Sequence, residues 1–157
     1  MPKPWNDQVL VGPSAIGQGV FAARQFRKGQ TIGRIEGTVL HSLDEITPYC
    51  IELDEIRSLE PAEPFRFLNH RCEPNCEVYS WDEDGERDFL YLMALRTIRA
   101  GEELTIDYSW PDYAAIRCKC GADNCRGWVV DPAQLDNLLR REQAKRDRRR
   151  KRSKVMT

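Results

Sequence analysis

The chain has 157 residues, and this length predicts one domain that is large enough for a hydrophobic core. No run of about 18 apolar residues occurs, so the sequence predicts no membrane span. The N-terminus lacks the apolar core of a signal peptide, and six cysteines in such a chain indicate thiols or metal ligands rather than disulfides. We therefore expect an intracellular protein, cytoplasmic if bacterial and nuclear if eukaryotic.

The formal net charge of −1 combines a basic C-terminal segment with an acidic remainder. The basic segment begins at Arg140 and ends at Lys154, while acidic residues gather at 52–63 and 82–88. An acidic body attracts partners rich in lysine and arginine, whereas the basic segment attracts nucleic acid, acidic protein or anionic lipid. Ordinary solvated surface charge is the alternative interpretation of each acidic cluster.

Short apolar runs divided by turn residues fill the first forty positions. Residues 8–11 predict a strand that ends in a turn at Gly12 and Pro13. A glycine-bearing loop is expected at 14–23, where Gly17 and Gly19 form a lone G-x-G that by itself favours a plain glycine turn. No third glycine follows at the spacing that dinucleotide binding needs. Residues 26–33 predict a turn and a strand, repeated in pattern at 98–104, and 35–40 predict another strand.

The middle of the chain continues this β-rich pattern. Residues 42–46 predict one capped helical turn and 49–53 a strand, with Cys50 as a buried small residue. Residues 77–81 and 87–95 predict a hairpin around the acidic loop 82–86. Many short strands and no long helical pattern before residue 131 indicate a mainly β fold.

A single helix is predicted near the C-terminus. Asp131 is suited to cap it and Pro132 to open its first turn, and leucines recur at helical spacing at 135, 138 and 139. We expect about one turn of this helix to dock on the body. The helix is then expected to fray into the basic tail.

Three stretches concentrate residues that carry chemistry. The first is Asn69-His70-Arg71-Cys72-Glu73-Pro74-Asn75-Cys76, the second is Gly101-Glu102-Glu103-Leu104-Thr105-Ile106-Asp107-Tyr108, and the third runs from Cys118 to Trp128. The third holds Cys118, Cys120 and Cys125, and an upstream cysteine makes a fourth thiol. Four thiolates satisfy tetrahedral zinc as a closed structural site, and reduced structural thiols are the alternative.

In this order, the three stretches resemble the SET-domain protein lysine methyltransferases. In that family, an Asn-His-x-Cys-x-Pro-Asn segment threads beside a Glu-Leu-x-x-Asp-Tyr segment, and a C-x-C-x4-C post-SET tail closes the site around zinc. The resemblance implies a β-clip-like fold of several short sheets with a pseudoknot-like threaded segment, a small zinc-bound tail and a C-terminal helix. It predicts a SET domain at 7–113, a post-SET zinc tail at 114–130, and a helix with a basic tail at 131–157.

The resemblance also implies roles for individual residues. It assigns catalysis to Tyr108, and it favours Cys72 over Cys76 as the fourth ligand of one structural Zn²⁺. Contacts with the methyl donor S-adenosylmethionine are implied for the following residues: Gly17, Gln18, Gly19, Asn69, His70, Tyr108 and Trp128. Ordinary aromatic packing is the alternative role of Trp128. The lysine channel is implied to include Ile35 and Ile106.

The sequence departs from the family pattern at Ile35, Arg71 and Ile106. Ile35 falls where many relatives have a tyrosine, and Arg71 replaces the usual small residue for no reason visible in the sequence. Ile106 falls where relatives have Phe or Tyr, whose identity influences how many methyl groups the site admits. Isoleucine cannot hold a water by hydrogen bonding where a tyrosine hydroxyl can, so we expect di- or trimethylation.

The function implied is methyl transfer from S-adenosylmethionine to a lysine of a basic protein or peptide, such as a histone, a histone-like protein or a ribosomal protein. The alternative is a catalytically weak SET module that acts as a protein- or nucleic-acid-binding adaptor. The segment from Arg140 to Lys154 predicts nonspecific contact with nucleic acid.

Overall fold

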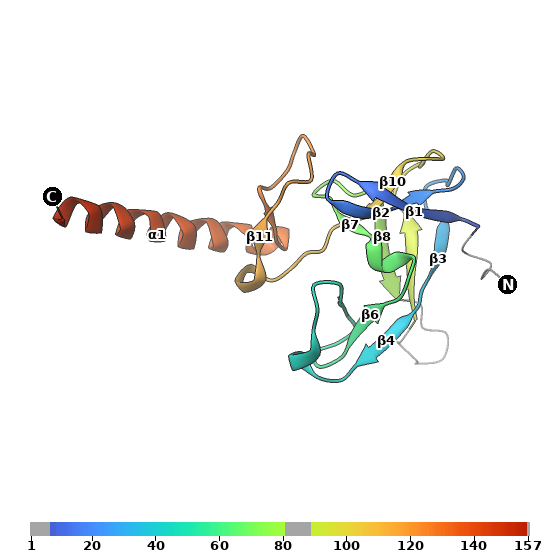
Figure 1. Cartoon of the computed structure of the whole chain (residues 1–157), viewed down its shortest axis with the longest axis horizontal. Helices are drawn as coiled ribbons and strands as arrows, with labels where there is room; N and C mark the ends of the chain where they lie inside the picture. The colour runs from blue at the N-terminus through green and yellow to red at the C-terminus, as the bar shows by residue number, and fades with distance from the viewer. Residues whose placement is uncertain (1–6, 81–88, 157) are drawn as a thin grey trace. The chain divides into compact units, whose positions relative to one another are not determined.

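The computed structural model describes residues 7–80 and 89–156, and it divides into two compact units. The first unit comprises Met1–His70 and Pro74–Ile106, and the second comprises Arg71–Glu73 and Asp107–Thr157. The described part is mainly β, with several small sheets and a C-terminal helix, as predicted (Figure 1). No helix within the described ranges is both long and apolar enough to cross a bilayer.

A four-stranded sheet of the first unit joins segments that lie far apart in the sequence. Its strands, in spatial order, are β1 (Val9–Ser14), β2 (Gly17–Ala22), β10 (Glu103–Ile106) and β7 (Asn69–His70). β1 and β2 are an antiparallel hairpin, β10 pairs antiparallel with β2, and β7 pairs parallel with β10. The sheet therefore brings the glycine segment, the Asn-His pair and the Glu-Leu-Thr-Ile segment side by side.

Two predictions for the N-terminal hairpin were wrong. The expected turn at Gly12 and Pro13 lies inside β1, which continues to Ser14. The expected glycine loop is largely strand β2, with Gly19 opposite Gly12. β1 is an edge strand, where a proline that lacks an N–H is tolerated because one side of the strand needs no ladder partner.

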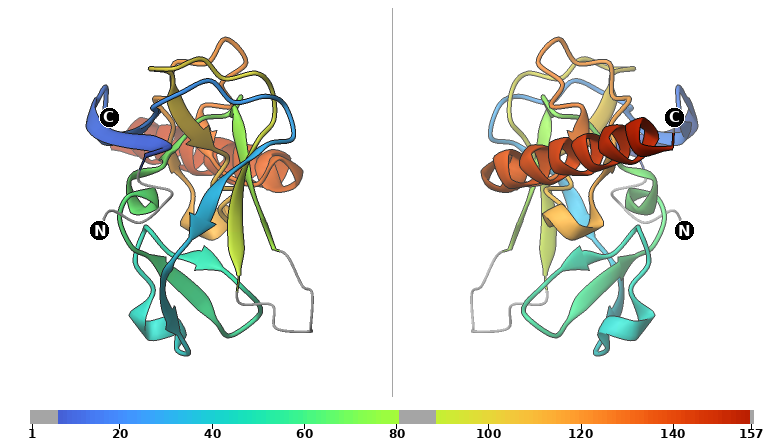
Figure 2. Two further views of the ribbon diagram at one scale, coloured as in Figure 1. Left: turned by 90° about the vertical axis from the view of Figure 1, so that its right-hand side faces the viewer. Right: turned by 90° about the vertical axis from the view of Figure 1, so that its left-hand side faces the viewer.

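Two three-stranded sheets complete the first unit. One contains β3 (Thr31–Ile35), β9 (Leu90–Ala94) and β8 (Cys76–Ser80), and the other contains β4 (Gly37–Leu40), β6 (Ser58–Pro61) and β5 (Ile51–Glu52). β8 and β9 are antiparallel, which confirms the predicted pair of strands, while the acidic loop between them lies outside the described residues. Figure 2 shows β3 running on into β4, so one continuous segment serves both sheets.

The core of the first unit follows the period-two pattern of its strands. Along β9, Leu90, Leu92 and Ala94 are buried and the residues between them are half-buried. The two similar turns predicted at 26–33 and 98–104 meet there, because Phe26 and Ile98 exchange backbone hydrogen bonds and both side chains are fully buried. The repeated sequence pattern thus corresponds to two turns that are hydrogen-bonded to one another.

Short 3₁₀ turns connect these strands. The first is η1 (Leu43–Glu45), where the Ser42 side chain accepts a hydrogen bond from the Asp44 N–H, as the predicted capped turn requires. The second is η2 (Phe65–Phe67). Cys50 was predicted to be buried but is half-buried, and its thiol donates to the Glu60 carboxylate at 3.1 Å.

The second unit contains η3 (Asp112–Ala114), β11 (Ile116–Arg117), β12 (Trp128–Val129), η4 (Pro132–Gln134) and α1 (Leu135–Val155). The Asp131 carboxylate accepts a hydrogen bond from the Ala133 N–H, so the predicted cap is confirmed. The predicted fraying was wrong, because α1 continues to Val155 (Figures 1 and 2). Arginine and lysine are good helix formers, and positive charge in the last turn interacts favourably with the helix dipole.

Candidate functional site

Four cysteines gather in the second unit, all within 4.8 Å of one another at their sulfur atoms: Cys72, Cys118, Cys120 and Cys125. Cys72 Sγ lies 3.7 Å from Cys118 Sγ and 3.9 Å from Cys125 Sγ. These separations are too long for disulfides, whose sulfurs lie about 2.05 Å apart. They match the edges of a tetrahedron of thiolates around zinc, which measure about 3.8 Å for a Zn–S distance of about 2.3 Å.

Backbone N–H groups point at the sulfurs of this thiol cluster. The Cys72 N–H donates to Cys120 Sγ at 3.5 Å, the Arg126 N–H to Cys72 Sγ at 3.5 Å, and the Gly127 N–H to Cys125 Sγ at 3.4 Å. Such donors stabilise thiolates. The donor set, its spacing and these N–H groups all fit one structural zinc ion with no open position.

Ionisation of the cluster is set by burial in competition with these hydrogen bonds. Burial raises the pKa of the Cys72 and Cys118 thiols above their ordinary value. Burial also acts on Cys120, but hydrogen bonds from the backbone of Cys72 and Ala122 and from the thiols of Cys118 and Cys125 together outweigh it and lower the pKa of Cys120 to about 6. Cys120 is thus the thiol that ionises first.

The two other cysteines lie elsewhere. Cys76 is 1% exposed in β8, and burial raises the pKa of its thiol to about 12. Cys50 shares the Glu60 carboxylate with the Thr47 hydroxyl. The structure therefore brings together the four cysteines of the predicted zinc set and leaves Cys76 in the apolar core of the first unit.

Two arginines that sequence reasoning did not place in the site extend from this cluster. Arg71 Nη1 donates to the Cys120 carbonyl at 3.0 Å, which supplies the physical reason that the sequence lacked for an arginine at this position. Arg126 follows the ligand position Cys125, and its Nη2 lies 2.8 Å from Asp107 Oδ1. Both side chains of that ion pair are mostly buried, at 13% and 21% exposed.

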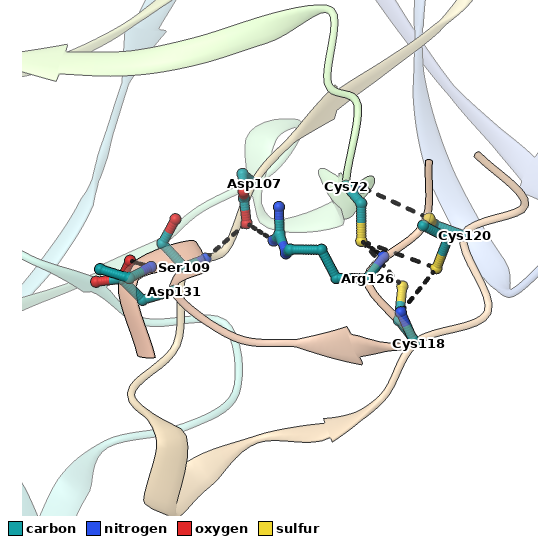
Figure 3. A network of polar contacts seen from close by, with 10 residues as sticks. Cys72, Asp107, Ser109, Cys118, Cys120, Arg126 and Asp131 are labelled. Atoms are coloured by element: carbon teal, nitrogen blue, oxygen red, sulfur yellow. Dashed lines mark hydrogen bonds and ion pairs between the residues drawn. The ribbon is translucent and has the colours of Figure 1, made fainter. Parts of the chain in front are cut away.

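Asp107 shapes the turn that carries Tyr108. Its Oδ1 accepts from the Ser109 N–H at 2.9 Å as well as from Arg126, and Ser109 has a φ of 46° (Figure 3). The left-handed conformation is uncommon for serine, and the Asp107 side chain holds it in place. The chain of contacts from the thiols through Arg126 to Asp107 therefore ends next to Tyr108. An arginine flanking a ligand cysteine, and an aspartate before the tyrosine, were the sequence signals for it.

The aromatic residues of the second unit have defined neighbours. Tyr108 is half-buried and stacks on Trp110, with ring centroids 5.4 Å apart. Trp128 lies in β12, and the guanidinium of Arg117 covers its ring at 4.2 Å from the centroid. Arg117 and Trp128 are opposite one another in the β11–β12 pair, so the observed packing is a cross-strand cation–π contact.

The other predicted donor contacts lie in the first unit, where Asn69 ties three segments together. Its Nδ2 lies 2.8 Å from the Gln18 carbonyl, 2.8 Å from Glu103 Oε1 and 3.1 Å from Ser14 Oγ. A Cβ at Gly19 would lie 2.5 Å from Glu103 Oε1, so a side chain there would displace the Glu103 carboxylate. Gly17 has a φ of 117°, which favours glycine. Gln18 is exposed.

Asn75 clamps β10 from the opposite end of the central stretch. The Thr105 N–H donates to Asn75 Oδ1 at 2.9 Å, and Asn75 Nδ2 donates to the Glu103 carbonyl at 2.8 Å. Asn75 is 4% exposed, so these bonds satisfy a buried amide. The Pro-Asn pair of the motif predicts a turn locally. In the structure, the Asn75 side chain makes the hydrogen bonds to β10 that the backbone of a neighbouring strand would otherwise make.

The remaining predicted site residues are buried in the first unit. Asn69 and His70 pair with Thr105 and Ile106 in the parallel β7–β10 ladder, and His70 is 7% exposed. Ile106 is 7% exposed and Ile35 only 2%. Their roles in donor binding and in a lysine channel stay predictions.

Comparison with known proteins agrees with this geometry. The family model described as "SET domain" matches residues 17–109. Histone-lysine N-methyltransferase ASHR3 of Arabidopsis thaliana is 40% identical over 75 residues, which cover 47% of this chain and 15% of the relative. Histone-lysine N-methyltransferase trr of Drosophila melanogaster is 33% identical over 149 residues, which cover 82% of this chain and 6% of the relative.

A solved structure shows the same likeness. The crystal structure of KRYPTONITE in complex with mCHG DNA and SAH superposes with a TM-score of 0.66 at 29% identity, covering 78% of this chain and 29% of that one. This chain spans 15% or less of the two curated relatives that it matches here. Because the family model matches more than half of the chain, the protein belongs to the SET domain family, and its thiol cluster fits the zinc-binding post-SET region of such proteins.

Proposed function

We propose that this protein transfers a methyl group from S-adenosylmethionine to the ε-amine of a lysine in a basic protein or peptide. The relatives named above are histone-lysine N-methyltransferases. KRYPTONITE has been solved with SAH, the demethylated donor, and also in a complex with SAH and an H3(1–15) peptide. These names support donor binding and lysine methylation in a chain of the same family.

The observation that carries the proposal is the joining of three segments at Asn69. Through its side chain and the β7–β10 ladder, this residue is bound to the glycine strand, to Glu103 and to the strand that leads into Tyr108. The arrangement supports a cradle for a small polar ligand.

The chemistry requires a neutral lysine. Its ordinary pKa is about 10.4, so the site must favour loss of the proton. A buried channel and the positive sulfonium of the donor both disfavour the ammonium form. The nitrogen lone pair then forms a bond to the methyl carbon, the carbon–sulfur bond breaks with its electron pair going to sulfur, and the proton has already left to solvent. Alignment supplies most of the acceleration.

Tyr108 is proposed to orient the incoming amine with its hydroxyl. The Asp107 contacts to Arg126 and Ser109 support this role, because they fix the backbone on both sides of the tyrosine. A catalytic group held by such contacts loses little energy to reorganisation. The thiol cluster would hold one zinc ion, which supplies structure rather than chemistry and keeps the segment bearing Arg126 folded.

The substrate is proposed to be a basic protein segment. In the first unit, Glu52, Glu55 and Glu63 are exposed, whereas Glu60 bonds to Thr47 and Cys50 and Asp54 pairs with Arg57. The exposed carboxylates support attraction of lysine and arginine side chains. Histone, histone-like and ribosomal proteins all have this chemistry. The predicted intracellular location is compatible with each of them.

Ile106 bears on how many methyl groups are added. Its side chain carries no hydroxyl to hold a water next to the amine, so we propose that the site proceeds to di- or trimethyllysine. Mass spectra of an exhaustively methylated substrate would check this, and a product that stops at monomethyllysine would contradict it.

The decisive experiment measures transfer of label from S-adenosylmethionine into basic proteins by the wild type and by Tyr108→Phe. We expect transfer by the wild type and a loss of at least about a hundredfold in the variant, with donor binding retained. Tyr113→Phe is the matched control, because Tyr113 is 85% exposed in the same unit. Absence of donor binding by the zinc-loaded wild type would overturn the proposal.

The alternative function is a SET module that binds partners with little turnover. Burial of Ile35 in the β3–β9 sheet, where many relatives have a tyrosine, favours it. Donor binding by calorimetry without label transfer to any basic protein would support this alternative over the enzyme.

A further inference from the structure

The C-terminal two-thirds of α1 is an exposed basic segment of the second unit. Every residue from 143 to 156 is exposed. Eight of these fourteen residues are lysine or arginine, and one, Asp147, is acidic. The start of the helix is fixed in the second unit by the buried Leu138 and by Arg141, whose guanidinium contacts the Asp112 carboxylate at 3.0 Å and its carbonyl at 3.1 Å. The basic segment therefore extends from an anchored base.

No apolar face runs along this basic segment. The exposed apolar side chains are Val155 and Met156 at its end, with Ala144 near its beginning. A helix that docks in a coiled coil or lies in a membrane interface needs an apolar stripe along its length. The segment also cannot gain stability from burial within the chain. The basic composition of this segment therefore indicates a negatively charged partner.

The positive charges surround the helix rather than occupying one side. Arg148, Arg149, Arg150 and Lys151 are consecutive, and each residue is turned by about 100° from the one before, so these four alone encircle the axis. A flat anionic surface would contact only one of these directions. A partner that places anions on several sides of a helix at once uses all of them.

Like charges are also neighbours along the helix. Arg146 and Arg150 are four residues apart, as are Arg148 and Arg152, and each such pair destabilises an isolated helix by a few tenths of a kcal/mol. The acidic residues nearby are already engaged: Glu142 binds Lys145 at 2.7 Å, and Asp147 accepts from Gln143 at 3.0 Å. Anions from a partner would remove this repulsion and favour the helix.

We propose that residues 143–156 bind double-stranded DNA through its phosphates, without reading base sequence, by lying in the major groove. An α-helix with side chains is about 10–12 Å wide, and the major groove of B-form DNA is about 12 Å wide with phosphates along both walls. The segment is about 21 Å long at 1.5 Å per residue, which corresponds to about six base pairs. Its eight lysines and arginines can bind phosphates whatever the base sequence.

The geometry distinguishes DNA from other polyanions. The major groove of A-form RNA is deep and narrow, so a helix of this width does not fit into it. An anionic membrane would meet one side of the helix and gain no apolar burial. Duplex DNA is the partner that places phosphates on both sides of the encircling charges, and this binding does not depend on methyl transfer.

The test measures binding of the full-length, zinc-loaded chain to a fluorescent 20-base-pair DNA as a function of salt. One variant carries Arg148→Gln, Arg149→Gln and Arg152→Gln, substitutions that keep good helix formers. The control carries Arg27→Gln, Lys28→Gln and Arg99→Gln, which remove the same charge from exposed residues of the first unit. We expect the helix variant to bind at least about tenfold more weakly and its salt slope to fall by roughly 0.9 for each lost phosphate contact. The control should bind like the wild type.

Three results would overturn the proposal. They are an equal loss in both variants, tighter binding of the wild type to single-stranded DNA or double-stranded RNA of the same length, and tighter binding to vesicles containing phosphatidylserine. Circular dichroism of the free proteins supplies the folding control, because the helix variant should keep the helix signal of the wild type.

Discussion

The two units of this protein are held together by different interactions. The first has an apolar core centred on β9, Phe26 and Ile98, together with three sheets. In the second, the buried apolar side chains among the described residues are Ala122, Val129, Val130 and Leu138. Its other fixed points are four thiols and a few buried polar contacts. The comparison teaches that the first unit can fold by burial, whereas the second needs a metal to compensate for a small core.

Loss of the metal is the largest expected effect, and it should unfold the second unit while the first unit stays folded. Replacing one ligand, as in Cys118→Ser, weakens metal binding, which contributes about 10 kcal/mol or more in small zinc domains. We expect hydrogen exchange to show loss of protection in 107–156 and retained protection in the strands of the first unit. Cys50→Ser, outside the cluster, should keep the zinc and the protection. Equal loss in both units would show that they fold as one.

Alkylation of the metal-free protein sharpens this prediction. At pH 7, the cysteines of the cluster should react readily with iodoacetamide, because without the metal the second unit no longer shields them. Cys76 should not react in the folded first unit, because its thiol is buried and its pKa is about 12. Zinc should protect the four cluster cysteines. Mass spectrometry of the labelled peptides gives the order of reaction.

The next largest effect is predicted in the first unit. Asn75→Ala leaves the buried Thr105 N–H and Glu103 carbonyl without their partner, which should lower the free energy of unfolding by about 2–4 kcal/mol. Urea denaturation measures the change, and zinc content should stay at one ion per chain. Asn124→Ala, at an exposed position in the second unit, should change stability by less than about 0.5 kcal/mol. A loss of zinc from Asn75→Ala would show that metal binding in the second unit depends on the stability of the first.

A smaller effect is expected on activity rather than stability. Arg126→Lys keeps the charge beside Asp107 but loses the planar guanidinium, so the turn at Tyr108 should loosen. We expect kcat for methyl transfer to fall about tenfold with KM for the donor and zinc content unchanged. Arg141→Lys, in a more exposed ion pair, is the control and should retain full activity. An increase in KM alone would assign Arg126 to substrate binding instead.

The smallest effect concerns the start of the helical region. Asp131→Ala removes the cap of the Ala133 N–H and should cost about 1 kcal/mol, while Asp131→Ser should recover most of it. Thermal unfolding followed by the helix signal measures both variants. Asp123→Ala, at an exposed loop position without a cap role, should be neutral within about 0.5 kcal/mol. A neutral Asp131→Ala would mean that Leu138 and Arg141 alone hold the helix.

Short-range patterns in the sequence were sufficient for much of the fold. The mainly β class, the β8–β9 pair, the Ser42 and Asp131 caps and the single C-terminal helix all follow from residues within a few positions of one another. Thiol spacing likewise pointed to a metal site. These features are predictable because turn chemistry, capping and side-chain periodicity act locally.

Other features depended on which distant segments meet, and only the tertiary structure decided them. Cys72 and Cys76 are four residues apart, yet one lies in the thiol cluster and the other in the core of β8. A side chain at Gly19 would displace the Glu103 carboxylate, and Asn75 binds Thr105, thirty positions away. The length of β1 depended on its place at a sheet edge. Such partners are set by the path of the chain, because the local sequence around a side chain does not reveal which remote backbone group it will bind.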